Sequence, residues 1–243
     1  MSIGHRQPGV RTTKAVSVPI EHQRLQGDYG SPLEPHGLIL FAHGSGSSRH
    51  SPRNQYVAGV LEQEGFATLL IDLLTEEEER VDSRTAHLRF DIEMLAGRLV
   101  AIIDWLLTRP ETASLPIGLF GASTGGGAAL VAAAARPREV SAVVSRGGRP
   151  DLAGSALPRV TAPTLLIVGG LDTPVIQMNR AAMAEMPGEV ALEIVPGATH
   201  LFEEPGALER VAVLAARWFT RHLEPAYTAR IDRASSSSSR PAK

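Results

Sequence analysis

A serine between two glycines, in Gly-Ala-Ser-Thr-Gly at 121–125, has the residue types and spacing of a nucleophile. An apolar run at 117–120 directly precedes it, and an alanine-rich stretch that is expected to be a helix directly follows it. A sharp strand–turn–helix connection lifts the hydroxyl out of a sheet, and glycine is needed on both sides because side chains would collide with the backbone. The pattern predicts that Ser123 attacks a substrate carbonyl. The alternative is a glycine-rich turn that binds phosphate at a helix N-terminus.

A serine hydroxyl needs a general base within hydrogen-bond reach, and histidine is the usual one. Two histidines follow Ser123 in the chain, His200 and His222. His200 leaves the apolar run 191–195 through a Pro-Gly turn that frees it to reach sideways. His222 continues the apolar face of the last expected helix, so we expect it to pack or to lie at a helix terminus. His200 is therefore the predicted base.

An aspartate is then expected to hold the imidazole tautomer and to stabilise the imidazolium. The order serine, acid, histidine leaves Asp172 as the candidate, because it ends an apolar run at the carboxyl edge of a sheet. Asp151, in an irregular loop, is the reserve, and Asp232 lies in the C-terminal tail. Asp172 could also cap the helix that Thr173 and Pro174 open, and the two roles can coexist.

Three further residues are expected to contact the substrate. The glycine-rich loop 43–48 follows an apolar run, and its backbone can curl so that an N–H points into the site. We predict the backbone N–H groups of Ser45 and Thr124 as the oxyanion hole, with an ordinary flexible turn as the alternative. Arg146, just past the run 140–144, could hold an anionic substrate group, although such an arginine is more often structural.

The elements that must position these residues alternate along the chain. Pro19 predicts an edge strand at 16–20. Most of the other expected strands are apolar throughout, as in strands covered on both faces: 38–42, 67–71, 117–120, 140–144, 164–168 and 191–195. Helical spacing links leucines and isoleucines from Leu88 to Leu106, and apolar residues from Leu208 to Phe219. Thr75 is expected to cap a helix that begins with the glutamates 76–79. The alternation predicts a mainly parallel sheet with helices on both faces and the site beyond the carboxyl ends of its strands.

The chain has 243 residues, which suits one α/β domain, expected at 15–225. A disordered tail is expected at 1–14 and a flexible serine-rich tail at 226–243.

The composition excludes several classes of function. A net charge of -2 means that the protein has no positive electrostatic field to attract nucleic acid or an anionic membrane. The absence of cysteine excludes a thiolate nucleophile or ligand. No metal-ligand spacing is seen, so neither metal nor cofactor is expected. No leader or membrane span is visible, which predicts a cytoplasmic protein.

The segments His43-Gly44, 121–125, Gly169 to Asp172 and Gly197 to Phe202 together resemble the α/β-hydrolase superfamily. Within it, they resemble the small, capless, dienelactone-hydrolase-like branch, over roughly residues 16–223. The resemblance implies an eight-stranded sheet with the second strand antiparallel, and hydrolysis of esters or lactones through an acyl-enzyme. Dienelactone hydrolases proper use a cysteine nucleophile, whereas this sequence offers Ser123, which favours a general carboxylesterase.

The expected function is hydrolysis of small-molecule carboxylic esters or lactones by a monomer or homodimer. No insertion between 140–144 and 164–168 is long enough for a large lid, so an open site and small acyl groups are expected. An amide or peptide hydrolase and a peroxide-using acyl transferase on the same residues are alternatives. A non-catalytic binding protein of the same fold is a third, because a fold does not fix a function.

Overall fold

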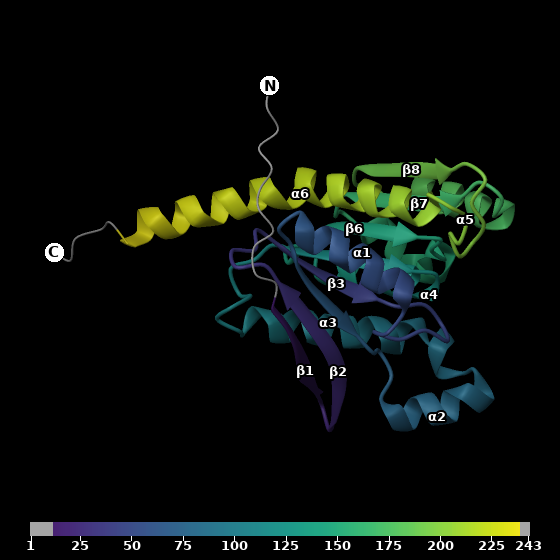
Figure 1. The fold of residues 1–243 in the computed structure, drawn as a ribbon, viewed down its shortest axis with the longest axis horizontal. Coiled ribbons are helices and arrows are strands. Elements are labelled where there is room, and N and C mark those ends of the chain that lie inside the picture. Colours follow the sequence, from purple (N-terminus) through teal and green to yellow (C-terminus); the bar gives the residue numbers. More distant parts are fainter. Residues whose placement is uncertain (1–11, 239–243) are drawn as a thin grey trace.

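A computed structural model of the protein describes residues 12–238, which form one eight-stranded sheet with helices on both faces (Figure 1). The strands are β1 (Thr12–Ile20), β2 (Gln23–Ser31), β3 (Leu38–Ala42), β4 (Ala67–Ile71), β5 (Ile117–Ala122), β6 (Val140–Arg146), β7 (Thr164–Gly169) and β8 (Val190–Val195). Their spatial order is β1-β2-β4-β3-β5-β6-β7-β8. The second strand runs antiparallel to both of its neighbours and all other pairs are parallel, as the family resemblance implies.

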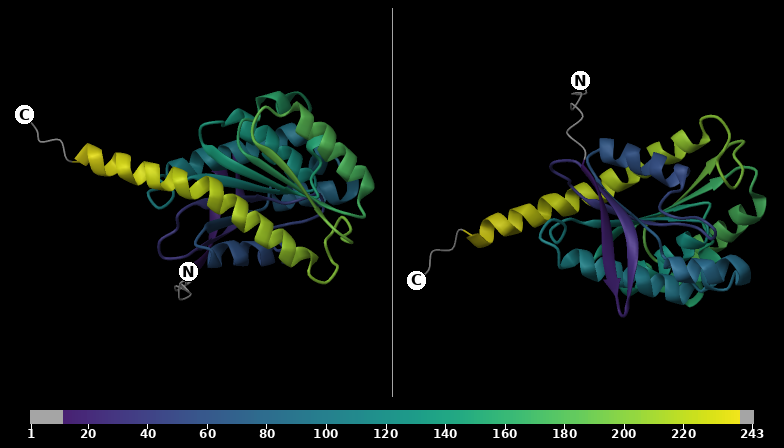
Figure 2. Two further views of the ribbon diagram at one scale, coloured as in Figure 1. Left: turned by 90° about the horizontal axis from the view of Figure 1, so that it is seen from above. Right: turned by 60° about the horizontal axis from the view of Figure 1, so that its bottom comes forward.

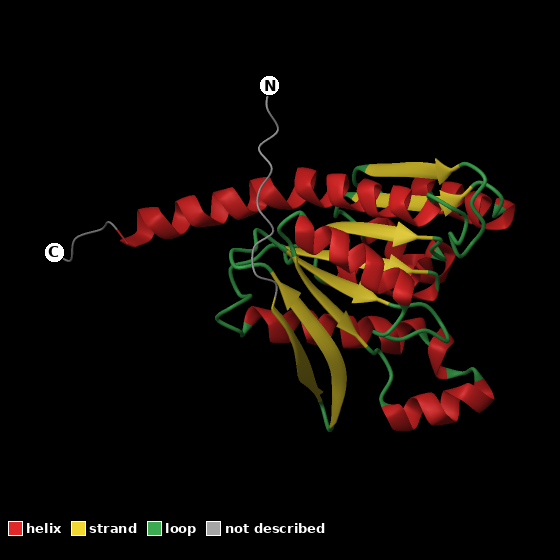
Figure 3. Ribbon diagram, in the orientation of Figure 1, coloured by secondary structure: helices red, strands yellow, loops and turns green. Residues whose placement is uncertain are grey.

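The helices form two layers around the sheet (Figure 3). They are α1 (Pro52–Gln63), α2 (Glu76–Thr85), α3 (Ile92–Leu107), α4 (Thr124–Ala135), α5 (Thr173–Glu185) and α6 (Ala207–Ser238), with short 3-10 helices η1 (Leu88–Phe90) and η2 (Pro150–Arg159). The α3 and α4 helices share one core with the sheet, and α1 and α6 share the other. In Figure 2, α6 crosses its face of the sheet and projects beyond it. No large cap domain is present among the described residues.

The central strands are buried on both faces, which explains their continuous apolar runs. In β3, Leu38 and Leu40 belong to the core under α3 and α4, whereas Ile39 and Phe41 belong to the core under α1 and α6. The carboxyl ends of these parallel strands meet at one edge. The loops that follow β3, β5, β7 and β8 are therefore gathered there, and they carry the residues singled out above.

Three elements differ from the prediction. The family resemblance implies a second, antiparallel strand, but the residues of β2 did not indicate it, because its polar residues and glycines look like a turn. Its Gly27 instead allows close approach, since an added Cβ would lie 3.0 Å from the carbonyl oxygen of Leu70. Leu88 lies in η1 rather than in the predicted helix, because the side chain of Asp91 accepts a hydrogen bond from the N–H of Met94 and starts α3 there. β1 begins at Thr12, ahead of the predicted strand.

The α6 helix continues past residue 225, where the sequence analysis places the end of the domain. Once a packed segment has nucleated a helix, each added residue gains a hydrogen bond for a small loss of conformational entropy. A helix can therefore extend beyond the segment whose apolar residues pack on the sheet. Residues 1–11 and 239–243 lie outside the described residues, and the predicted disorder of the two tails stays a prediction there. Within the described part of the chain, no helix is both long enough and apolar enough to cross a membrane.

Candidate active site

Ser123 sits at the sharp turn between β5 and α4 with φ 51° and ψ −121°. A positive φ in a non-glycine residue costs about 1–3 kcal/mol and persists only where the surroundings impose it. A Cβ on Gly121 would lie 2.6 Å from the carbonyl oxygen of Gly125, and a Cβ on Gly125 would collide with the carbonyl of Ala42. The two glycines are therefore required by the turn, as the sequence pattern predicts.

The other two predicted residues lie next to this serine. His200 Nε2 is 3.4 Å from Ser123 Oγ, and His200 Nδ1 is 2.6 Å from Asp172 Oδ2. Alcohol, imidazole and carboxylate thus form one hydrogen-bonded series from three loops. The imidazole is 39 % exposed and the carboxylate 14 % exposed, so the series opens to solvent at the histidine.

The acid and the histidine are brought together by pairing of their two loops. The N–H of Gly170 donates to the carbonyl of Val195, at 2.8 Å, and the N–H of Leu171 to that of Ala198, at 2.9 Å. A Cβ on Gly169 would lie 2.5 Å from the carbonyl of Ala198, so glycine permits this approach. The backbone of these loops therefore fixes the distance between the carboxylate and the imidazole.

The alternatives for acid and base are engaged elsewhere. Asp172 occupies the N-cap position of α5, yet its side chain makes no capping hydrogen bond. Asp151 forms a two-pronged pair with Arg149, at 2.8 and 2.7 Å. His222 packs against Trp218 with the two rings tilted by 53° and their centroids 4.5 Å apart, and burial lowers the pKa of His222 despite the nearby Glu189. The expectation that His222 is a packing residue is confirmed.

The predicted oxyanion loop lies against the nucleophile, but one donor already has a partner. A Cβ on Gly44 would be 3.0 Å from that of Ser123. The N–H of Ser45 donates to the side-chain oxygen of Thr124 at 2.9 Å. The N–H of Thr124 is in the first turn of α4, where a helix offers no internal acceptor.

Arg146 is not a surface cation. It is buried on the α1 and α6 side of the sheet, with its guanidinium carbon 6.0 Å from the centroid of Phe120. Burial, together with repulsion from Arg53, lowers its pKa to about 10, and its Nη1 is buried without a hydrogen-bond partner. The predicted substrate contact at Arg146 stays a prediction.

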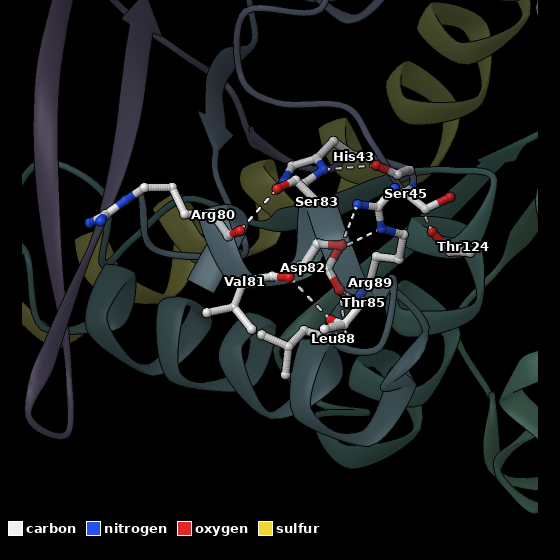
Figure 4. Close-up of polar contacts among 11 residues, drawn as sticks. His43, Ser45, Arg80, Val81, Asp82, Ser83, Thr85, Leu88, Arg89 and Thr124 are labelled. Atoms are coloured by element: carbon white, nitrogen blue, oxygen red, sulfur yellow. Dashed lines mark hydrogen bonds and ion pairs between the residues drawn. The ribbon is translucent and has the colours of Figure 1, made fainter. Parts of the chain in front are cut away.

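The segment from α2 to η1 borders the oxyanion loop and was not singled out as part of the site. Asp82, 1 % exposed, accepts hydrogen bonds from the backbone N–H groups of Leu88 and Arg89 and from the Arg89 side chain (Figure 4). This places Arg89 Nη1 3.5 Å from a Cβ built on Gly46. The sequence signal was slight, a lone aspartate near the end of an acidic helix.

A groove of about 400 Å³ lies between the oxyanion loop and the start of α2. Its walls carry hydroxyl and carboxylate groups, from Ser47, Ser48, Asp72, Thr75 and Glu79 among others. The predicted cap at Thr75 is confirmed, and it forms a reciprocal capping box with Glu78. Among the described residues, no group of histidines and carboxylates is arranged to hold a metal ion.

Comparisons with known proteins bear on the family and the fold. The family model of the dienelactone hydrolase family matches residues 35–224. The crystal structure of dienelactone hydrolase from Anabaena variabilis is 62% identical with a TM-score of 0.86, covering 88% of this chain and 99% of that chain. A cold-adapted esterase from an Arctic intertidal metagenomic library shares the fold, with 18% identity and a TM-score of 0.71, covering 88% and 94% of the two chains.

A curated relative carries a different name. A Mycobacterium tuberculosis protein named provisionally as a phosphoribosyl transferase is 64% identical over 199 residues, which make up 82% of this chain and 44% of that protein. This chain therefore spans less than half the length of the curated relatives it matches.

Proposed function

This chain belongs to the dienelactone hydrolase family, and on that basis we propose that it cleaves small carboxylic esters or lactones through an acyl-enzyme on Ser123. The observation that carries the proposal is the series of hydrogen bonds from Ser123 through His200 to Asp172. A hydroxyl, a base and an orienting carboxylate in this order are what nucleophilic acyl transfer needs.

The reaction follows from the placement of these groups. His200 Nε2 accepts the proton of Ser123 while Oγ bonds to the carbonyl carbon, and Asp172 stabilises the resulting imidazolium. The backbone N–H of Thr124 donates to the negative oxygen of the tetrahedral intermediate. The imidazolium then protonates the departing alcohol. Water, deprotonated by the same histidine, attacks the acyl-enzyme and returns the serine and the acid product.

The mycobacterial relative does not change this proposal. More than half of that protein lies outside the region that matches this chain, so its name belongs to a protein of which this chain covers only 44%. The groove beside the oxyanion loop has a volume of about 400 Å³, which falls in the range of small-molecule sites, although Ser123, Asp172 and His200 do not line it. With a serine in place of a cysteine, we propose a general carboxylesterase rather than a hydrolase of dienelactone itself.

A series of p-nitrophenyl esters of increasing acyl length, tested beside aminoacyl amides, checks the proposal. We expect turnover of short acyl esters, labelling by a fluorophosphonate probe, and loss of both in Ser123→Ala. Ser155→Ala, which changes an exposed serine in η2, is the matched control and should retain both.

Other outcomes favour the alternatives. Turnover of amides without esters would indicate a peptidase, and peroxide-dependent acyl transfer would indicate an acyl transferase. A chain that is neither labelled nor active, yet binds ligands, would be a binding protein.

A further inference from the structure

The peptide unit between Gly44 and Ser45 is held from both sides (Figure 4). Its carbonyl oxygen is 3.0 Å from His43 Nδ1, and its N–H donates to Thr124 Oγ1 at 2.9 Å. The N–H of Leu73 donates to His43 Nε2 at 3.0 Å. Because Nε2 must accept this bond, the ring carries its hydrogen on Nδ1 and donates it to the carbonyl of Gly44.

A trans peptide points its C=O and its N–H in opposite directions. The bond from His43 to the carbonyl of Gly44 therefore also fixes the direction of the Ser45 N–H. The result is a directed series of hydrogen bonds, from Leu73 through His43 and the peptide unit to Thr124 Oγ1. His43 is a positioning residue for that peptide.

The series ends on the hydroxyl of Thr124, whose own hydrogen makes no hydrogen bond within the described part of the chain. A threonine hydroxyl can accept two hydrogen bonds and donate one. In the described part of the chain, Thr124 Oγ1 accepts from Ser45 and meets no acceptor for its hydrogen. Thr124 is buried, and its hydroxyl is bound to the loop that lies against the nucleophile. In that loop, a Cβ on Gly44, the neighbour of Ser45, would be 3.0 Å from the Cβ of Ser123.

We propose that the Thr124 hydroxyl, rather than the Ser45 N–H, is the second hydrogen-bond donor of the oxyanion hole. This rests on the proposed function and deepens it. Thr124 then supplies both donors, its N–H and its O–H, and Ser45 polarises the hydroxyl from behind. Donors linked in series strengthen one another.

The Ser45 N–H is already engaged by its hydrogen bond to Thr124 Oγ1. Thr124 is buried, whereas Ser45 is exposed, so solvent reaches the loop from the Ser45 side. The hollow that adjoins both residues is also bordered by Arg89 and Leu95. A substrate oxygen would have to displace Thr124 Oγ1 before it could accept a hydrogen bond from the Ser45 N–H.

In the competing role, the Thr124 side chain only occupies the hydrogen-bonding position of the Ser45 N–H, and it moves away when substrate binds, so that Ser45 becomes the donor. Substitutions separate the two roles. Thr124→Ser keeps the hydroxyl, Thr124→Val replaces it with a methyl group of similar size, and Thr124→Ala removes it and uncovers Ser45. If the hydroxyl is the donor, Thr124→Ser should stay within a few-fold of wild type. Both other variants should then lose about a hundred- to a thousand-fold in kcat, with little change in KM.

A thionoester of the same acyl group gives a readout that folding does not affect. Its sulfur accepts hydrogen bonds poorly, so wild type should prefer the oxygen ester strongly, and Thr124→Val should lose most of that preference. The ratio of the two rates, measured on one preparation, is independent of the fraction of folded enzyme. An unchanged ratio in Thr124→Val, or a Thr124→Ala variant at least as active as wild type, would overturn the inference.

The outcome also separates this inference from the proposed function. If wild type turns over no ester and takes no fluorophosphonate label, the proposed function fails, and the inference fails with it. If wild type is active and depends on Ser123, while Thr124→Val is equally active, only the inference fails.

Discussion

At the scale of single residues, the position of Asp172 separates a catalytic role from a capping role. The residue stands where a helix cap would stand, yet its carboxylate faces His200 at 2.6 Å. We expect Asp172→Asn to keep the geometry but to favour the wrong imidazole tautomer, so that kcat falls about ten-thousand-fold. Steady-state kinetics on a p-nitrophenyl ester measure this. Asp151→Asn, which breaks only the pair with Arg149, is the control, and a larger loss there would reverse the assignment.

Arg146 is a second residue whose role can be decided by substitution. Its guanidinium is buried beside Phe120, and burial lowers its pKa to about 10, which means that the fold disfavours the charge. We expect Arg146→Met to raise the free energy of unfolding by about 1–3 kcal/mol, because it removes a desolvated cation. Urea denaturation measures this change.

The same variant tests the predicted substrate contact at Arg146. If the arginine binds an anionic substrate group, Arg146→Met would raise KM for esters that carry a carboxylate and leave KM unchanged for neutral ones. Equal KM changes for both kinds of ester would remove Arg146 from the site.

At the scale of elements, a pH-dependent ion pair between Glu78 and Arg98 holds α2 against α3. Arg98 contacts Glu78 through Nη1 and Nη2, at 2.7 and 2.5 Å. Burial alone would raise the pKa of Glu78, but hydrogen bonds from Arg98 and Thr75 outweigh it and bring the pKa to about 2. A carboxyl whose pKa is lower in the folded state stabilises the protein above its unfolded pKa and loses that effect as pH falls.

We therefore expect the stability difference between wild type and Glu78→Gln to be full at neutral pH. It should shrink as pH falls from about 4.5, the ordinary pKa, towards about 2. Urea denaturation at several pH values measures the difference. Glu77→Gln, a neighbour in the same helix, is the control, and an equal pH response from both variants would contradict the assignment.

The elements also show which parts of the molecule the sequence could predict. The proximity of Ser123, Asp172 and His200 could be predicted because each follows an apolar strand, and parallel strands end at one edge. β2 was missed because a half-buried strand with glycines has the composition of a turn. The bond from Ser45 to Thr124 joins residues 79 positions apart, and no local pattern encodes such a contact.

At the scale of the whole molecule, α6 holds one face of the sheet together. Phe219 is fully buried and packs on Phe66, with ring centroids 6.3 Å apart. It also fills the space over Gly118, where an added Cβ would lie 2.6 Å from its ring. We expect Phe219→Ala to lower the free energy of unfolding by about 3–5 kcal/mol, because it leaves a cavity. Val213→Ala, 40 % exposed on the same helix, should change stability by less than about 1 kcal/mol. Thermal and urea unfolding compare the two.

The groups that are proposed to react come from loops that are spread along the chain, and His200 precedes only the last helix. Proteins are synthesised from the N-terminus, and a nascent chain folds as its segments emerge from the ribosome. All eight strands precede His200, so a chain interrupted before this residue already contains the whole sheet and Ser123. Such a product lacks the proposed base, and we expect it to be inert.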